Sequence, residues 1–122
     1  MQFKKLGATD LSIAPLVLGG NVFDWTADKQ TSFAILDAYL GAGFNAIDTA
    51  DVYSIFSPGK IGGESERVLG EWMQDRGVRD RVVLMTKGGL PMGEGMKGLG
   101  HDYLPKAVDA SLKRLKIALG RG

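Results

Sequence analysis

Three short apolar runs, each followed by a stretch with helical periodicity, constrain the fold of this chain more than any other feature. The runs cover residues 15–20, 44–48 and 82–87. They are continuous rather than alternating, which is typical of parallel strands that are covered on both faces. Because strands and helices alternate along the chain, the pattern predicts right-handed βα crossovers and an α/β fold.

The predicted helices cover residues 28–40, 65–76 and 102–115. Asp28 and Asp102 are placed to cap the first and third helices, since Asp is a preferred N-cap residue. The apolar stripe predicted to bury the third helix consists of Leu104, Val108, Leu112 and Leu115. Residues 1–14 have the pattern of a β-hairpin. We therefore expect one domain over residues 1–122, with a hairpin at 1–14, three βα units at 15–115 and an atypical tail at 116–122.

Composition excludes several classes of function. A net charge of +1 gives no electrostatic attraction to nucleic acid or to an anionic membrane, so neither is an expected partner. The 122 residues include no cysteine, and no cluster has metal-ligand spacing, so we expect no disulfide and no metal site. No apolar run approaches the ~18 residues that span a bilayer, and no secretion signal is evident. These observations favour a cytoplasmic location.

Charged residues stand where two of the predicted strands end. Asp48 ends the second strand and Lys87 ends the third. Because neighbouring parallel strands lie ~4.8 Å apart, both side chains should meet at one edge of the sheet, where ligands bind in α/β folds. Tyr53 follows five residues after Asp48 and can fold back over this edge. An ammonium group favours the ionised form of a neighbouring phenol, which would make Tyr53 a usable proton donor. A structural ion pair beside an ordinary loop tyrosine is the alternative.

Several stretches together resemble the aldo-keto reductase family. They are, in chain order, Leu18-Gly19-Gly20-Asn21-Val22-Phe23, Asp48-Thr49-Ala50-Asp51-Val52-Tyr53, Gly62-Gly63-Glu64-Ser65-Glu66, Thr86-Lys87 and Ser111-Leu112-Lys113-Arg114-Leu115. The resemblance covers residues 1 to about 115 and includes the N-terminal hairpin. It implies the first part of a (β/α)8 TIM barrel whose bottom the hairpin closes.

The resemblance also implies a function, the NADPH-dependent reduction of aldehydes or ketones to alcohols. Tyr53 would correspond to the family's proton donor, Lys87 to the lysine that activates it, and Asp48 to the carboxylate paired with that lysine. The loop at Gly20, Asn21 and Val22, together with Asp48, would line the nicotinamide ribose. A small carbonyl compound is the implied substrate.

The chain departs from the family in two ways. The family's catalytic histidine ends a fourth strand that begins with an Asp-Tyr-Ile-Asp-like run, whereas here residues 116–122 do not resemble that strand. His101 is the single histidine, and its position before the third helix favours a solvated loop residue. The chain also supplies three βα units, whereas a closed barrel takes at least ~200 residues. We therefore expect a truncated or frameshifted product that is inactive or weakly active alone and self-associates through an exposed strand edge.

Two other interpretations remain open from the sequence. One is a non-catalytic, degenerate or regulatory barrel fragment, and the other is a self-contained open α/β module that binds a small ligand. The run Gly93-Glu94-Gly95-Met96-Lys97-Gly98 fits the dinucleotide pattern G-x-G-x-x-G. That pattern requires a direct turn from strand to helix, and this run lies five residues after the strand, so we interpret it as a loop.

Overall fold

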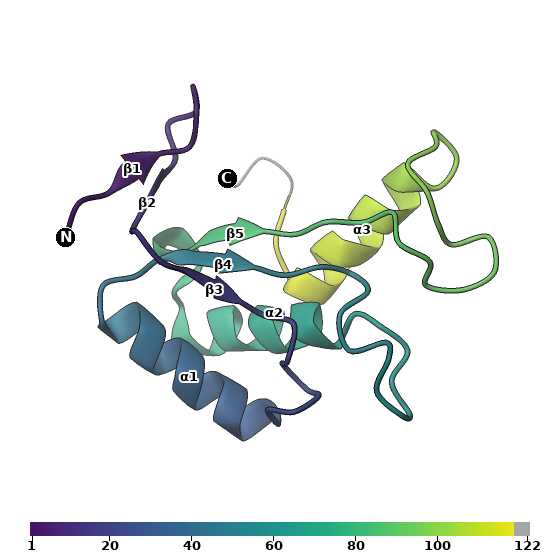
Figure 1. Cartoon of the computed structure of the whole chain (residues 1–122), viewed down its shortest axis with the longest axis horizontal. Helices are drawn as coiled ribbons and strands as arrows, with labels where there is room; N and C mark the ends of the chain where they lie inside the picture. Colours follow the sequence, from purple (N-terminus) through teal and green to yellow (C-terminus); the bar gives the residue numbers. More distant parts are fainter. Residues whose placement is uncertain (119–122) are drawn as a thin grey trace.

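The computed structural model describes residues 1–118 (Figure 1). The elements, in chain order, are β1 (Lys4–Lys5), β2 (Ser12–Ile13), β3 (Val17–Gly19), α1 (Lys29–Gly41), β4 (Ala46–Asp48), α2 (Glu64–Arg76), the 3-10 turn η1 (Arg79–Arg81), β5 (Val83–Met85) and α3 (Leu104–Leu115). The predicted hairpin and three βα units are therefore present. Among the described residues, no helix has the length and apolarity needed to cross a lipid bilayer.

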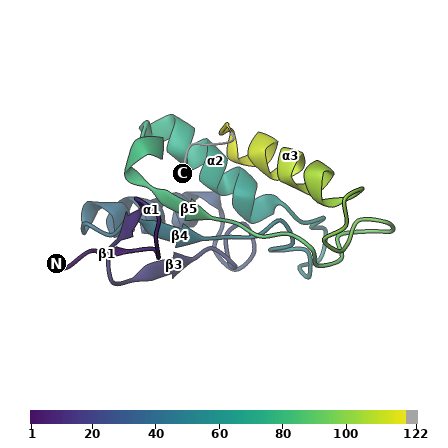
Figure 2. The same ribbon diagram turned by 90° about the horizontal axis from the view of Figure 1, so that it is seen from above.

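The strands form two separate sheets. β1 and β2 pair antiparallel as the hairpin, whereas β3, β4 and β5 form a parallel sheet with β4 in the middle. Figures 1 and 2 show the hairpin at one end of this sheet and helices along its length. Within residues 1–118, β5 pairs with β4 alone, so the sheet stays open at β5 and no barrel closes. The fold is a partial α/β architecture, as the sequence predicts.

The hydrophobic core lies between the parallel sheet and the helices. Ile47 of the middle strand is fully buried and stands in register with Leu18 and Leu84 of the strands beside it. The helices contribute the buried side chains Leu36, Tyr39, Leu40, Val68, Leu69, Trp72, Met73 and Leu115. The apolar stripe of α2, formed by Val68, Leu69, Trp72 and Met73, is wholly buried. Fully burying one such aliphatic side chain contributes about 1.5–3 kcal/mol. This core fixes β4, and with it the end of the strand where Asp48 lies.

The N-terminal ends of α1 and α3 are capped differently. Asp28 caps α1 as predicted, since its carboxylate accepts a hydrogen bond from the Thr31 backbone N–H at 2.8 Å. The predicted cap at Asp102 is wrong. The helix α3 begins at Leu104 after Tyr103, with no side-chain cap and with a proline in its first turn. Proline fits there because its missing N–H would have had no partner within the helix.

The packing of α3 also differs from the prediction. The face that α3 buries carries Ala107, Ser111 and Leu115, whereas Val108 is 39% exposed. The helix approaches α2 so closely that a Cβ on Gly70 would lie 2.8 Å from the Leu115 carbonyl carbon. Because Gly70 allows α3 to approach α2 closely, Leu115 of the predicted stripe is buried, whereas Leu104, Val108 and Leu112 stay partly or largely exposed.

Candidate active site

The side chains of Asp48, Tyr53 and Lys87 meet beyond the C-terminal ends of β4 and β5. The Lys87 Nζ donates to both carboxylate oxygens of Asp48, each at 3.0 Å, and to the Tyr53 Oη at 2.9 Å. It also donates to the Thr49 carbonyl oxygen at 2.7 Å. The predicted pairing of Asp48 with Lys87 is therefore present. The contact of Lys87 with the Thr49 carbonyl oxygen could not be predicted, because a backbone carbonyl is present at every residue.

These contacts fix the direction of the Tyr53 hydroxyl. An ammonium group has hydrogens to give and no lone pair, so the Tyr53 oxygen accepts from Lys87. The hydroxyl proton then points away from Lys87, and no acceptor for it lies among residues 1–118. The side chain is partly exposed, so a polar group from solution can reach this proton.

The electrostatics of Lys87 reflect two opposing effects. Partial burial lowers the pKa of Lys87, but the hydrogen bonds from its ammonium group to Tyr53 and to Asp48 outweigh burial and raise that pKa above its usual value. The lysine therefore stays charged throughout the neutral range.

Ser65, at the start of α2, holds the two loops that border the site. Its Oγ donates to the Gly20 carbonyl oxygen at 2.7 Å and shares a 2.7 Å hydrogen bond with the Thr49 Oγ1. Gly20 follows β3 and Thr49 follows β4, so a single hydroxyl group joins the loops after both strands. Ser65 is fully buried, which makes these hydrogen bonds hard to replace by water.

Glu66, the next residue of α2, joins β5 and α3. Its carboxylate accepts from the Thr86 Oγ1 at 2.7 Å and from the Arg114 Nε at 2.8 Å. The side chain of Glu66 is fully buried and that of Arg114 is 15% exposed. Residues from three of the recognised motifs thus form one buried network beneath Lys87. The sequence signal that could have revealed this network was Glu66, a carboxylate on the face of α2 that is buried.

Asp51 has a different environment, although it belongs to the same motif as Asp48. It is 1% exposed, and neither carboxylate oxygen has a hydrogen-bond partner among the described residues. Burial raises its pKa, and the nearby negative charge of Glu66 raises it further, against the opposing effects of Arg114 and of the nearby backbone N–H groups of Val52 and Asp51. A buried carboxylate without a well-formed hydrogen bond from another side chain is unusual in folded proteins.

The predicted cofactor loop lies beside Asp48, Tyr53 and Lys87, which together are called the trio below. The Gly20 backbone N–H donates to the Asp48 carbonyl oxygen at 2.8 Å, which places residues 20–22 at the same edge of the sheet. Gly20 is buried, and a Cβ there would lie 3.0 Å from the Ser65 Oγ, so the close contact requires glycine. Val22 packs against the core and Asn21 is exposed. Asn21 is therefore the member of the loop that offers a polar side chain to a ligand.

The remaining sequence candidates lie outside this arrangement. His101 is exposed, and no hydrogen bond or ion pair of its side chain is present in the part of the chain that the structure describes. The glycine-rich run at 93–98 forms an exposed loop before α3. No three His, Cys, Asp or Glu side chains within residues 1–118 gather as a metal site requires. Of the tail at 116–122, Lys116 and Ile117 close α3, and residues 119–122 lie outside the described part.

The chain is similar to known proteins over most of its length. Residues 15–118 match the family model described as the aldo/keto reductase family. The chain belongs to this family. An uncharacterized 11.2 kDa protein of Pseudescherichia vulneris is 57% identical over 90 residues, which cover 73% of this chain and 87% of that protein. An aryl-alcohol dehydrogenase [NADP(+)] of Phanerodontia chrysosporium is 37% identical over 120 residues, which cover 89% of this chain and 29% of the dehydrogenase.

Solved structures of aldo-keto reductases share the fold. An aldo-keto reductase from Bacillus halodurans, solved in its holo form, superposes with a TM-score of 0.75 at 30% sequence identity. The superposition covers 96% of this aldo/keto reductase chain and 37% of the B. halodurans protein. The chain thus spans about a third of the length of the full-sized reductases that it matches.

Proposed function

We propose that this chain carries the proton-transfer part of a carbonyl reductase site that works with NADPH. The contact that supports this proposal is the 2.9 Å hydrogen bond from the Lys87 ammonium to the Tyr53 oxygen. It leaves the phenol proton free and places a positive charge beside the oxygen that must release it. Membership of the aldo/keto reductase family supports the same chemistry.

In this proposal Tyr53 is the catalytic residue, and Lys87 and Asp48 are positioning residues. Reduction of a carbonyl compound places negative charge on the substrate oxygen, and the Tyr53 hydroxyl gives its proton to that oxygen. Lys87 stabilises the phenolate that remains, since its ammonium already donates to the same atom. Asp48 holds the ammonium in place through two hydrogen bonds of 3.0 Å. NADPH, when bound, supplies the hydride.

The residues present fit the nicotinamide end of the cofactor. The loop 20–22 adjoins Asp48 through a backbone hydrogen bond, and the exposed Asn21 offers an amide beside the trio. We therefore propose that Asn21, with the backbone of Gly20 and Val22 and with Asp48, holds the nicotinamide ribose. The NADP(+) in the name of the P. chrysosporium dehydrogenase supports the choice of cofactor.

A chimaera tests the proposed role of Tyr53. Residues 15–118 of this chain would replace the matched segment of the P. chrysosporium dehydrogenase, and NADPH oxidation with an aryl aldehyde would be followed. Loss of general acid catalysis costs about 10²–10⁴-fold in rate, so Tyr53→Phe should lower kcat at least 100-fold with little change in KM. Tyr103→Phe is the matched control, since Tyr103 lies outside the trio, and it should leave kcat within about twofold.

Two results would contradict this proposal. One is a Tyr53→Phe chimaera that keeps the parent rate. The other is a chimaera that binds NADPH and melts like the dehydrogenase, yet reduces nothing. Either result would favour the non-catalytic interpretation of these residues.

A further inference from the structure

Ser54, the residue that follows Tyr53, has a backbone conformation that residues with a side chain rarely adopt. Its φ is 75°, in the left-handed region that favours glycine. Within residues 1–118, the other non-glycine residues with positive φ are Asp24 and Lys116. Lys116 ends α3, where a left-handed residue is common. Ser54 ends no helix, and a strained residue of this kind persists only where its surroundings hold it in place.

Tyr53 and Ser54 are the two central residues of a tight turn. The Ile55 backbone N–H donates to the Val52 carbonyl oxygen at 3.0 Å, which closes the turn. Positive φ at the second central residue alone is the pattern of a type II turn, in which glycine or asparagine usually takes this position. A serine without support for its side chain would favour the type I turn, in which φ at this position is negative.

The type of turn also determines the backbone of Tyr53. In a type II turn the ψ angle of the first central residue is about +120°, whereas in a type I turn it is about −30°. The rotamers open to a side chain depend on its own φ and ψ, so a change of turn alters the directions that the Tyr53 ring can take. The 2.9 Å hydrogen bond from the Lys87 Nζ to the Tyr53 Oη therefore depends on which turn residues 52–55 form.

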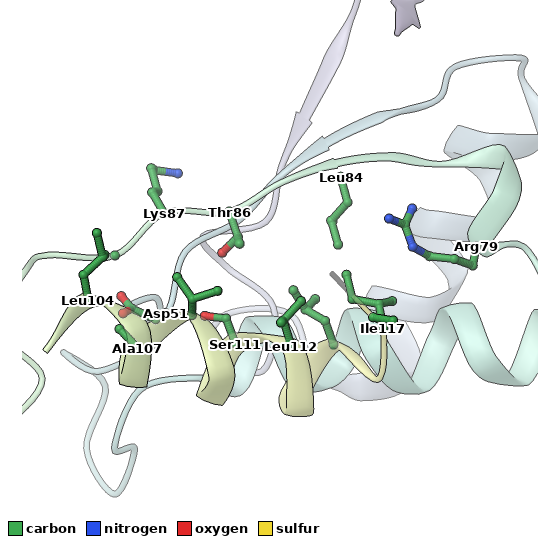
Figure 3. A pocket seen from close by; sticks show the side chains of 14 residues that line it. Asp51, Arg79, Leu84, Thr86, Lys87, Leu104, Ala107, Ser111, Leu112 and Ile117 are labelled. Atoms are coloured by element: carbon green, nitrogen blue, oxygen red, sulfur yellow. The ribbon is translucent and has the colours of Figure 1, made fainter. Parts of the chain in front are cut away.

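The contact between Tyr53 and Lys87 lies on the side of the chain away from α3. Figure 3 shows the Lys87 side chain pointing away from that helix, whereas the Thr86 side chain points toward it. Neighbouring residues of an extended chain alternate in this way. The ammonium group of Lys87 and the Tyr53 oxygen that accepts from it are therefore placed by the loops beyond the sheet, and the turn at residues 52–55 belongs to one of these loops.

The hydroxyl group of Ser54 supplies the support that this turn needs. Its Oγ donates to the Phe23 carbonyl oxygen at 2.8 Å, and Ser54 is 3% exposed. Phe23 is 1% exposed and belongs to the hydrophobic core, so the acceptor is held firmly. Loss of the hydroxyl would leave a buried carbonyl oxygen without this donor, which is costly. The hydrogen bond thus offsets the strain at Ser54 and keeps its φ positive.

The same hydrogen bond joins the loop of Tyr53 to the loop proposed to hold the cofactor. Phe23 directly follows residues 20–22 in the chain. Asp24, the next residue, forms a second link through an ion pair with Lys60 at 3.1 Å. The side chains of this pair are 37% and 31% exposed, so water and salt weaken it. Ser54 is therefore the buried link between these two loop segments, and the ion pair is the exposed one.

We propose that Ser54 is a positioning residue for Tyr53. Its buried hydroxyl holds residues 52–55 in the type II turn, and this turn keeps the Tyr53 oxygen on the Lys87 ammonium group. The hydroxyl acts through Tyr53 and takes no part in the proton transfer itself. The effect on catalysis rests on the proposed function of Tyr53, whereas the effect on the position of the ring is independent of it.

Two substitutions at residue 54 separate the turn from the hydroxyl group. Ser54→Ala removes the hydroxyl and keeps a side chain that disfavours positive φ, so the turn should change. Ser54→Gly also removes the hydroxyl, but glycine adopts positive φ readily and should keep the type II turn. If the hydrogen bond served stability alone, Ser54→Gly would be at least as damaging, because it also adds freedom to the unfolded chain.

NMR spectroscopy of the 122-residue chain provides the first test. The nuclear Overhauser effect between the Tyr53 ring protons and the Lys87 ε-methylene group reports their contact, and Tyr53→Phe assigns the ring signals. Ser54→Ala should lower its intensity at least threefold, whereas Ser54→Gly should keep more than half of it. Ser57→Ala is the matched control, since Ser57 lies in the same loop and its side chain has no hydrogen bond within residues 1–118.

The chimaera with the P. chrysosporium dehydrogenase provides the second test, through the separation of kcat from KM. Ser54→Ala should lower kcat at least tenfold and leave the KM for the aldehyde within about twofold, because the proton donor is displaced and the other contacts stay. Ser54→Gly should restore kcat to at least a third of the parent value. Ser57→Ala should stay within about twofold of the parent.

The outcomes decide the role of Ser54 separately from that of Tyr53. Equal loss of the contact in Ser54→Ala and Ser54→Gly would overturn the proposal, and so would a Ser54→Ala chain that keeps the contact. If Ser54→Ala does not fold, the Ser54→Gly chain decides, because loss of the contact there overturns the proposal and its retention supports it. A Tyr53→Phe chimaera that keeps the parent rate would contradict the proposed function alone, since the NMR contact is measured without catalysis.

Discussion

At the scale of single residues, Asp48 and Asp51 show how position decides the chemistry of one side-chain type. They lie three positions apart in one motif, and Asp48 has an ammonium partner at 3.0 Å, whereas the Asp51 carboxylate has no side-chain donor within residues 1–118. The difference arises because Asp48 ends the middle strand next to Lys87, whereas Asp51 turns beneath the loop toward α3. The same carboxylate is therefore paired with an ammonium group in one case, whereas in the other its burial opposes the charged form.

The pH dependence of stability should reveal the penalty at Asp51. Burial raises its pKa above the ordinary value of 3.8. An acid whose pKa is raised by folding binds its proton more tightly in the native state, so its contribution to stability is lost as the pH rises from about 4. We expect Asp51→Asn to be more stable than the wild type at pH 7 by about 1–3 kcal/mol, with a smaller difference at pH 4. Urea unfolding at both values measures it.

The comparison between variants removes the effects of other carboxylates. Hydrogen bonds from Arg76 and Trp72 lower the pKa of Asp37, so stability from that group is lost as the pH falls. Both proteins keep Asp37, and its effect cancels in the difference. Asp109→Asn, an exposed change on α3, should follow the wild type at every pH. If Asp51→Asn is less stable than the wild type at pH 7, the Asp51 carboxylate is stabilised in the native state rather than destabilised by burial.

At the scale of elements, the buried pair Glu66–Arg114 should contribute more to stability than any exposed pair. Arg114→Met leaves the fully buried Glu66 carboxylate with the Thr86 hydroxyl as its remaining donor. We expect a loss of about 3–5 kcal/mol in the free energy of unfolding. Arg76→Met breaks an ion pair whose side chains are 39% and 45% exposed and should cost at most about 1 kcal/mol.

Urea titration of both variants measures this difference. A chain that is already unfolded without urea in the Arg114→Met form would indicate a loss as large as the whole stability. Equal effects of the two substitutions would show that Glu66 finds other donors and that the network does not hold α3 in place.

The sequence predicts elements well where their determinants are local. Asp28 caps α1 because the cap needs one side chain and the N–H three residues on, and the stripe of α2 is buried because β4 and β5 precede and follow it. The third helix shows the limit. Val108 was predicted in the core, yet the close approach of α3 to α2 at Gly70 buries Ala107, Ser111 and Leu115 instead, and that contact depends on two helices at once. The meeting of Asp48 with Lys87 could be predicted, because the order of the strands places both at one edge of the sheet. The burial of Asp51 could not be predicted, because it depends on how α2 and α3 pack.

At the scale of the whole molecule, an open sheet limits what the chain can bind. The chain spans 37% of the B. halodurans reductase, and within residues 1–118 the loop 20–22 is the segment we assign to the cofactor. We expect NADPH to bind the isolated chain more weakly than micromolar, since this loop reaches one end of the cofactor. Fluorescence titration measures this, with the B. halodurans reductase as the positive control. Micromolar binding by a monomer would contradict this expectation.

The short distance in sequence between Asp48, Tyr53 and Lys87 has a consequence for how the gene segment that encodes them can evolve. Asp48 and Lys87 stand 39 positions apart, with Tyr53 between them, on the central strand and one neighbour of the sheet. One short stretch of gene therefore encodes all three groups together with the helix that holds their loops. Such a stretch can pass between genes by recombination as one unit, and a break in the coding region downstream of it keeps the hydrogen-bonded group of Asp48, Tyr53 and Lys87 together.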